Sequence, residues 1–188
     1  MGRRPRIDPA SIVAASLAIA DQRGLAAVTM QAVADRLGVT PMALYRHVDD
    51  KADLLDRVVE ALLTELPLPS ADLPWDQRLR ALGQAVRAIA RRHPHVFPLL
   101  LQRPATTPES RRVRDAVVAS LIEAGLDDEA ARRAERLLST IILGFAASEA
   151  GGRFRGHNKR VIDEDFACLE ELIASALQHA TAASKRPS

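Results

Sequence analysis

A group of side chains between residues 40 and 51 combines cationic, hydrogen-bonding and apolar types at a spacing that suits contact with nucleic acid. Arg46 and Lys51 can pair with phosphate oxygens, and Tyr45 and His47 can donate hydrogen bonds to the same oxygens. Arg46 could also reach the edges of bases, and Met42 can pack on thymine methyl groups. The candidate contacts in this stretch are Thr40, Pro41, Met42, Tyr45, Arg46, His47 and Lys51.

The residues just before this group carry the signals of a short helix that ends in a tight turn. Thr29 can cap a helix whose apolar residues, at positions 30, 33, 34 and 37, recur at three- and four-residue spacing. Gly38 supplies the positive φ that ends such a helix. A first helix is therefore predicted at about 30–37, and the small side chain of Ala34 would let a second helix approach it at a steep angle.

A second, shorter helix is predicted at about 41–47. Thr40 can cap it, Pro41 fits its first position because the missing N–H has no intrahelical partner there, and Leu44 falls on the face turned to the first helix. The pair is a helix-turn-helix, whose second helix enters the major groove of DNA by its N-terminus. Thr40, Pro41 and Met42 would then meet base edges, and the later side chains would lie over the sugar-phosphate backbone.

The charge distribution agrees with a DNA-binding N-terminal region. Residues 1–51 carry seven Lys and Arg against five Asp and Glu, so the formal excess of +2 for the whole chain lies there. Arg3, Arg4 and Arg6 form a basic arm that could follow a phosphate backbone or enter a minor groove, although a solvated tail is an equally good reading of the arm alone.

Composition predicts a wholly α-helical fold. The chain has 188 residues, of which 47% are hydrophobic and only 3% aromatic, and its long periodic segments have helical spacing. We expect nine or ten helices in two domains: a helix-turn-helix domain at 1–49 and a larger domain at 50–188. Single helices are predicted near 50–66, 75–92, 95–102, 107–124, 127–150 and 163–182. Asp8 and Pro9 are expected to open the first helix as its cap and first turn.

Three segments resemble the TetR family of bacterial transcriptional regulators, and together they cover about the first third of the chain. These segments are residues 12–24 (IVAASLAIADQRG), residues 29–51, and the run from Lys51 to Leu55. The run from Leu44 to Val48, with Val where most of the family has Phe, is most similar to the tetracycline-repressor branch. The resemblance implies that Thr29, Tyr45, His47 and Lys51 hold phosphates.

The resemblance also implies a helical body that dimerises and binds an inducer, with repression as the usual mode. The final two long helices would pack against their counterparts in a second subunit. A homodimer also follows from geometry, because two reading helices about one helical turn apart can address a palindromic operator. The positions assigned to core or interface are Leu137, Leu138, Ile141, Ile142, Phe145, Leu169, Leu172, Ile173 and Leu177.

The inducer is expected to be a small and largely apolar molecule. By the resemblance, Leu82, Val86 and Leu99 stand where the tetracycline-repressor branch has polar and aromatic drug ligands, so a metal-chelated tetracycline is not expected. The alternative is that these residues are simply core. The expected lining consists of Leu82, Val86, Phe97, Leu100, Leu101, Val117, Leu121 and Ile141.

No catalytic residues, metal or cofactor are expected. His93 and His95 have a spacing seen at some metal sites, but no third ligand completes a set. The alternative function is an all-α enzyme or interaction scaffold with an incidental helix-turn-helix, although no nucleophile or phosphate-loop motif supports it. The single Cys168 and the lack of a long apolar run favour a cytoplasmic protein that does not interact with membranes.

Overall fold

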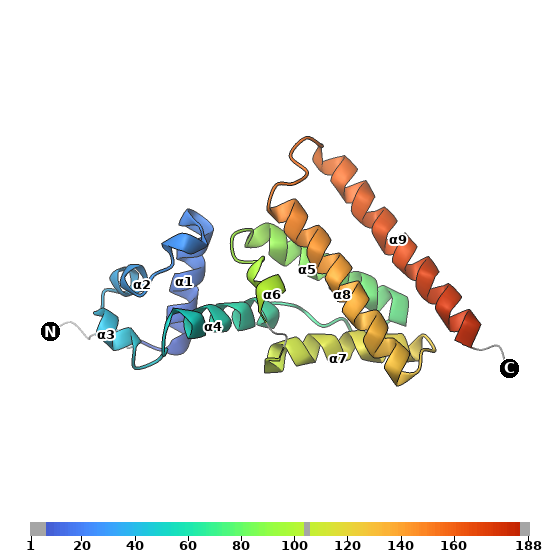
Figure 1. Cartoon of the computed structure of the whole chain (residues 1–188), viewed down its shortest axis with the longest axis horizontal. Helices are drawn as coiled ribbons and strands as arrows, with labels where there is room; N and C mark the ends of the chain where they lie inside the picture. The colour runs from blue at the N-terminus through green and yellow to red at the C-terminus, as the bar shows by residue number, and fades with distance from the viewer. Residues whose placement is uncertain (1–6, 104–105, 185–188) are drawn as a thin grey trace.

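The computed structural model describes residues 7–103 and 106–184, and every regular element in these ranges is a helix (Figure 1). The basic arm with Arg3, Arg4 and Arg6 lies outside the described residues. The elements are α1 (Pro9–Arg23), the 3₁₀ turn η1 (Leu25–Ala27), α2 (Met30–Leu37), α3 (Pro41–Leu44), α4 (Lys51–Thr64), α5 (Trp75–Arg92), α6 (Leu99–Gln102), α7 (Pro108–Glu123), α8 (Asp128–Ala150) and α9 (Lys159–Ser184). The predicted fold class is confirmed.

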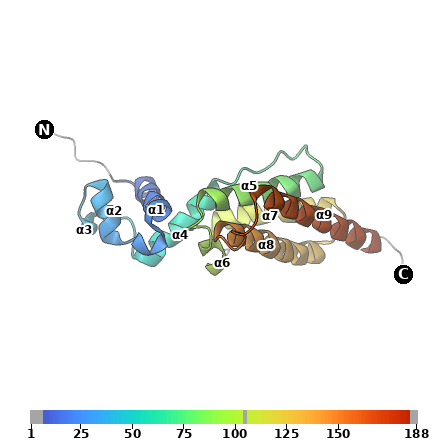
Figure 2. The ribbon, with the colours of Figure 1, turned by 90° about the horizontal axis from the view of Figure 1, so that it is seen from above.

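The molecule is elongated, with a small head at one end and a larger body at the other. Figures 1 and 2 show α1, α2 and α3 grouped at the N-terminal end, α4 running from this group toward the body, and α5 to α9 forming the body. In both views α9 runs back alongside α8, in the opposite chain direction, on the outer side of the body. The short α3 therefore lies far from the C-terminal helices.

Side-chain caps define most helix starts, as the sequence indicated. Asp8 accepts a hydrogen bond from the backbone N–H of Ser11 and completes a capping box before Pro9. Asp50, Thr107 and Asp127 cap α4, α7 and α8 in the same way. Each cap satisfies a backbone donor that the first helical turn leaves unpaired.

One hydrophobic core runs from the head into the body. It includes Ile12 and Leu44 in the head, Leu54 and Leu62 along α4, and Phe97 in the body, all at most 1% exposed. A second cluster around Val118 and Leu121 joins α7, α8 and α9 at the far end of the body. Because α4 contributes to the core of both parts, the predicted division at residue 50 stays a prediction.

Polar contacts fix the end of α4 to the start of α7. Glu60 accepts a hydrogen bond from the backbone N–H of Glu109, with an O···N distance of 2.9 Å, in the first turn of α7. Arg112 donates to the backbone carbonyls of Leu63 and Leu66, at 2.8 and 3.1 Å. These contacts satisfy both an unpaired helix N-terminus and an unpaired helix C-terminus.

Two predicted helices are shorter in the structure. The helix expected at 41–47 ends at Leu44, because the N–H of His47 bonds to the carbonyl of Leu44 in a tighter turn. Thr40 has the extended backbone of a cap, but its side chain accepts no hydrogen bond from the helix, so that part of the prediction is wrong. The helix expected at 95–102 begins only at Leu99, after Pro98, with turns before it.

The last helix begins earlier than predicted. It starts at Lys159 instead of residue 163, because the side chain of Asn158 accepts a hydrogen bond from the N–H of Val161 at 3.0 Å and caps the helix. No helix in the described ranges is long and apolar enough to cross a membrane.

Candidate nucleic-acid interface and internal cavity

The helix-turn-helix begins with a firmly capped α2. The side-chain oxygen of Thr29 accepts a hydrogen bond from the N–H of Ala32 at 3.0 Å. At the other end Gly38 has φ of 68°, the left-handed conformation expected of a helix-ending glycine. Val33 and Ala34 are fully buried, and Ala34 gives α3 room to approach. These local features hold the two helices in a fixed relation.

The short α3 turns one apolar side chain inward and leaves most of its other side chains accessible. Leu44 is fully buried, whereas Met42 is 73% exposed and Tyr45 48% exposed. Thr40 and Arg46 are exposed too, and Pro41 and His47 are half-buried. A large apolar side chain that is mostly in water gains free energy when a partner covers it. The accessible face of α3 therefore carries an apolar residue beside hydrogen-bonding ones.

Two cations at this surface are available to an external anion. Neither Arg46 nor Lys51 forms an ion pair or a side-chain hydrogen bond with any residue of the described ranges, and both are exposed. The neighbouring acid Asp53 is occupied, since its carboxylate accepts from Arg57 at 3.0 Å and from the N–H of Asp49. The hydrogen bond from Arg57 lowers the pKa of Asp53, which keeps it ionised within α4.

The body contains a cavity of about 680 Å³, walled by residues of α4, α5, α6, α7, α8 and α9. Its volume lies within the range of small-molecule sites, and its wall is mainly aliphatic and aromatic. Of the eight residues predicted to line it, five do so: Leu82, Val86, Phe97, Leu100 and Val117.

The other three predicted lining residues lie elsewhere. Leu101 is 49% exposed on the one-turn helix α6. Leu121 is buried in the second core cluster, between Val118 and Leu126. Ile141 is 44% exposed on the outer side of α8. Helical periodicity places each of these residues on an apolar stripe, but it does not indicate which neighbouring helix that stripe faces.

Sequence reasoning also missed two acidic residues of the cavity wall. Glu135 and Glu170 line the cavity and are 7% and 8% exposed. A signal was present, since each occupies a position on an apolar stripe of its helix. Glu135 lies between Ala131 and Leu138, and Glu170 lies between Phe166 and Ile173. Charged residues are rarely buried in this way unless they are paired, so they call for a functional explanation.

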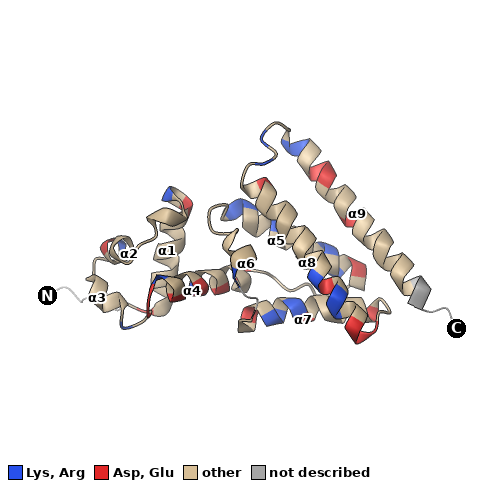
Figure 3. Ribbon diagram, viewed as in Figure 1, with Lys and Arg blue, Asp and Glu red and all other residues tan. Residues whose placement is uncertain are grey.

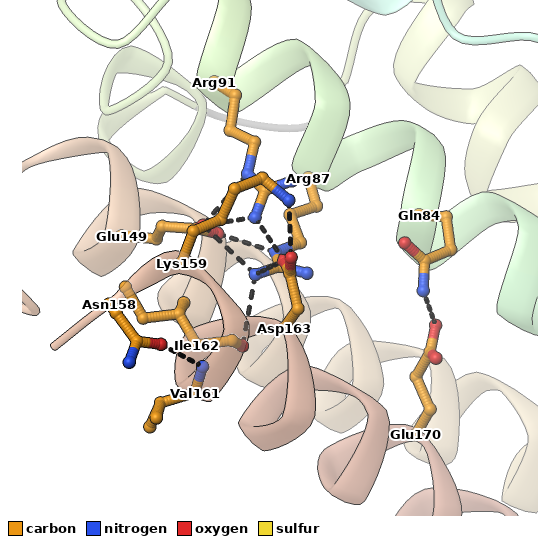
Figure 4. A network of polar contacts seen from close by, with 10 residues as sticks. All are labelled: Gln84, Arg87, Arg91, Glu149, Asn158, Lys159, Val161, Ile162, Asp163 and Glu170. Carbon is orange, nitrogen blue, oxygen red and sulfur yellow. Dashed lines mark hydrogen bonds and ion pairs between the residues drawn. The ribbon is translucent and has the colours of Figure 1, made fainter.

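A network of ionic contacts joins α5 and α8 to the start of α9 (Figure 4). Its centre is Arg87, whose side chain is 5% exposed and donates to Glu149 at 2.6 and 3.1 Å. Arg87 also pairs with Asp163 at 2.9 Å and donates to the carbonyl of Ile162 at 3.2 Å. Arg91 contacts the same two carboxylates at 2.7 and 2.6 Å.

Charge and aromatic contacts stabilise this network. Burial opposes ionisation of Glu149, but hydrogen bonds from Arg87 and Arg91 outweigh it and lower the pKa of Glu149. A hydrogen bond from Lys159, assisted by Arg91, holds the pKa of Asp163 well below its usual range. The guanidinium of Arg87 lies 4.6 Å from the ring centre of Phe166.

His93 and His95, whose spacing is seen at some metal sites, lie in different environments. His93 is buried and its Nδ1 lies 2.8 Å from a carboxylate oxygen of Asp21 in α1, whereas His95 is exposed. In the part of the chain that the structure describes, no cluster of three potential ligands could hold a metal ion.

Comparison with known proteins identifies both parts of the chain. Residues 12–58 match the family described as bacterial regulatory proteins, tetR family, and residues 79–176 match the tetracyclin repressor-like C-terminal domain. The HTH-type transcriptional repressor DrrR1 of Streptomyces coeruleorubidus is 28% identical over 93% of this chain and 67% of its own length. The class A tetracycline repressor protein from transposon 1721 of Escherichia coli is 31% identical over 78% of this chain and 69% of its own length.

Solved structures share the fold. BioQ of Mycobacterium smegmatis superposes with a TM-score of 0.79 at 25% identity, both alone and bound to its double-stranded DNA operator. In the complex the match covers 93% of this chain and 99% of BioQ. The chain spans about two thirds of the length of the curated relatives named above.

Proposed function

Since this chain belongs to the TetR family of DNA-binding transcriptional regulators, we propose that it is a homodimeric repressor that binds a palindromic operator and leaves it when a small molecule occupies the cavity. The relatives carry names of repressors, and one of them is a tetracycline repressor. The alternative from the sequence, an all-α enzyme or interaction scaffold, gains no support from these relatives.

The observation that carries the proposal is the accessible face of α3. Met42 is 73% exposed beside Tyr45 and Arg46, while Leu44 on the opposite face is fully buried. Thr40, Pro41 and Met42 would meet base edges in the major groove. Tyr45, His47 and Lys51, together with Thr29 at the start of α2, would hold phosphates, and Arg46 could serve in either role.

Exposed apolar residues on α8 and α9 support a homodimer. Leu137, Ile141 and Leu172 are 61%, 44% and 64% exposed. Figure 3 shows charged residues toward the start of α9, and residues 172–184 contain no Lys, Arg, Asp or Glu. An apolar face of this kind is covered by a partner in many stable oligomers. Pairing of this face with a second copy would provide the two reading helices that a palindrome requires.

Selection from a random duplex library tests the function, followed by binding to the selected sequence at several salt concentrations. A palindrome with half-sites about one helical turn apart is expected, with affinity falling steeply between about 50 and 200 mM salt. No enrichment, or affinity that is flat with salt, would contradict the proposal.

Two substitutions separate the proposed roles. Lys51→Ala should weaken binding to all duplexes alike and reduce the salt dependence, whereas Met42→Ala should change the preferred sequence. Lys159→Ala is the matched control, because Lys159 also opens a helix but lies in the body. It should leave DNA binding unchanged, and the reverse pattern for Lys51 and Met42 would contradict the proposed docking.

A further inference from the structure

Two carboxylates interrupt the mainly apolar inner wall of the cavity. Glu135 on α8 and Glu170 on α9 are more than nine-tenths buried, and both line the cavity. A buried carboxylate is unfavourable unless cations or several donors compensate for the water it has lost. Their position at a cavity wall therefore suggests that a ligand supplies the missing partner.

Within the described ranges, each carboxylate has one neutral donor and no ion pair. Glu170 accepts a hydrogen bond from the side-chain amide of Gln84 at 2.9 Å (Figure 4), and Glu135 accepts from the hydroxyl of Ser139 at 2.8 Å. In both cases the bonded atom is Oε1. A carboxylate can accept about four hydrogen bonds, so each retains capacity for another donor.

The other charged side chains of the wall are less deeply buried. Burial raises the pKa of Glu170, against the opposing effects of Gln84, Arg80 and Arg87. Charges in contact with water are screened more strongly than buried ones, so the buried part of the wall is acidic. Among these other charged residues of the wall, Arg103 and Arg114 are partly buried; Arg103 pairs with Asp56, and Arg114 has partners of its own. The remaining ones are exposed: Asp56, Asp76, Arg80, Arg132 and Arg136.

The rest of the wall fits a hydrophobic molecule. Leu82, Phe97 and Leu62 are at most 4% exposed, and Trp75 and Val86 extend the apolar surface. Gly83 adds no side chain to the wall, and a carbon added there would lie 3.8 Å from Oε1 of Glu170. A ligand here needs an apolar body and a hydrogen-bond donor, and a cationic donor makes the stronger bond to a carboxylate.

We propose that the effector of this chain is an amphipathic organic amine, whose apolar body fills the cavity and whose protonated amino group donates to Glu135 or Glu170. The inference rests on the proposed function only in that it calls this ligand an effector, which releases DNA when it binds. It replaces the largely apolar effector expected from the sequence with a cationic class.

Three compounds with the same apolar body test the ligand class: 3,3-diphenylpropylamine, 3,3-diphenylpropan-1-ol and 3,3-diphenylpropanoate. Isothermal titration calorimetry with the full chain measures each affinity at pH 7. The amine is expected to bind about tenfold more tightly than the alcohol, because its donor is charged. The carboxylate should bind most weakly, because it would face like charges.

The double variant Glu135→Gln/Glu170→Gln shows whether these residues cause the preference. It keeps the shape of both side chains, so the alcohol should bind as before, while the amine's advantage should fall below about threefold. Glu171→Gln is the matched control, since Glu171 is exposed on α9 and lies off the cavity wall. Equal binding of amine and alcohol, an unchanged preference in the double variant, or no binding of the amine would each overturn the inference.

Release of the selected operator distinguishes this inference from the proposed function. An amine that binds through Glu135 and Glu170 without releasing DNA would contradict effector control and leave the ligand class standing. Release by the alcohol or the carboxylate at lower concentration than the amine would have the opposite meaning, because effector control would hold and the ligand class would fail.

Discussion

Replacement of Arg87 by Met should remove the central cation of the α5–α8–α9 network while keeping much of the side chain's apolar stem. Arg87 is nearly fully buried and contacts Glu149, Asp163 and the carbonyl of Ile162. The side chain of Glu149 is only 12% exposed, so the substitution leaves a buried carboxylate with one fewer cation. The start of α9 would also lose a direct connection to α5.

The expected loss of unfolding free energy is about 3 kcal/mol. Breaking a buried ion pair by removing one partner costs about 3–5 kcal/mol. Arg91 still contacts Glu149 and Asp163, which reduces the loss, whereas the lost stacking of the guanidinium on Phe166 adds about 1 kcal/mol. Asp163 is more exposed and keeps Lys159 as a partner, so its contribution is minor.

Urea unfolding at pH 7 measures this loss, at a fixed protein concentration because the stability of any oligomer depends on concentration. The control is Arg133→Met, which removes an exposed pair with Glu129 and should change stability by less than about 0.5 kcal/mol. In the double variant Arg87→Met/Glu149→Gln the loss should be smaller than the sum of the single losses. A loss below about 1 kcal/mol for Arg87→Met, or strict additivity, would refute the argument.

Three further outcomes are expected. The native pKa of Glu149 lies below its value of 4.5 in the unfolded chain. Its contribution to stability is therefore present above pH 4.5 and is lost as the pH falls through the native pKa. Acid unfolding of a Glu149→Gln variant should depend less on pH than that of the unchanged chain. Gly38→Ala should lower the unfolding free energy measured in urea titrations by about 1 kcal/mol, because Gly38 has a φ of 68°. Gly83→Ala should raise it by about 0.5–1 kcal/mol, because Gly83 lies in a helix and the added carbon would make only ordinary contacts. Leu172→Glu should yield monomers by light scattering, whereas the control Leu68→Glu, in the loop before α5, should leave a dimer. A dimeric Leu172→Glu variant would contradict the proposed interface.

The head could be predicted from sequence because short-range signals determine it. Thr29, Gly38 and Pro41 act through backbone conformation within a few residues, and the inward position of Leu44 follows from helical spacing. The bounds predicted for α2 therefore match the structure. The prediction for α3 extended three residues too far, because nothing in the spacing reveals that the turn tightens after Leu44.

The cavity wall was harder to predict because it depends on how separate helices approach one another. Leu82 and Leu121 look alike in sequence, as apolar residues on helical stripes, yet one lines the cavity and the other lies in the second core cluster. Periodicity gives the side of a helix that is buried, but it does not give the distance to the helix opposite. Glu135 and Glu170 occupy positions on apolar stripes, and spacing alone does not reveal that an acidic residue there faces a cavity.

The position of α4 explains how a ligand in the body could act on the head. Val59 and Leu62 of α4 line the cavity, while Leu54 on the same helix belongs to the core that holds the head. Glu60 ties α4 to the first turn of α7, yet its Oε2 is buried without a hydrogen-bond partner in the described part of the chain. An unpaired buried oxygen costs about 1–3 kcal/mol, so the Glu60 contact between α4 and α7 stabilises their arrangement less than its hydrogen-bond distance indicates. A ligand can shift α4 only if it binds two arrangements of α4 and α7 with different affinity. Because the cavity wall is built from both helices, a change in their relative position alters the wall itself. The two arrangements therefore offer a ligand different walls, and hence different affinities.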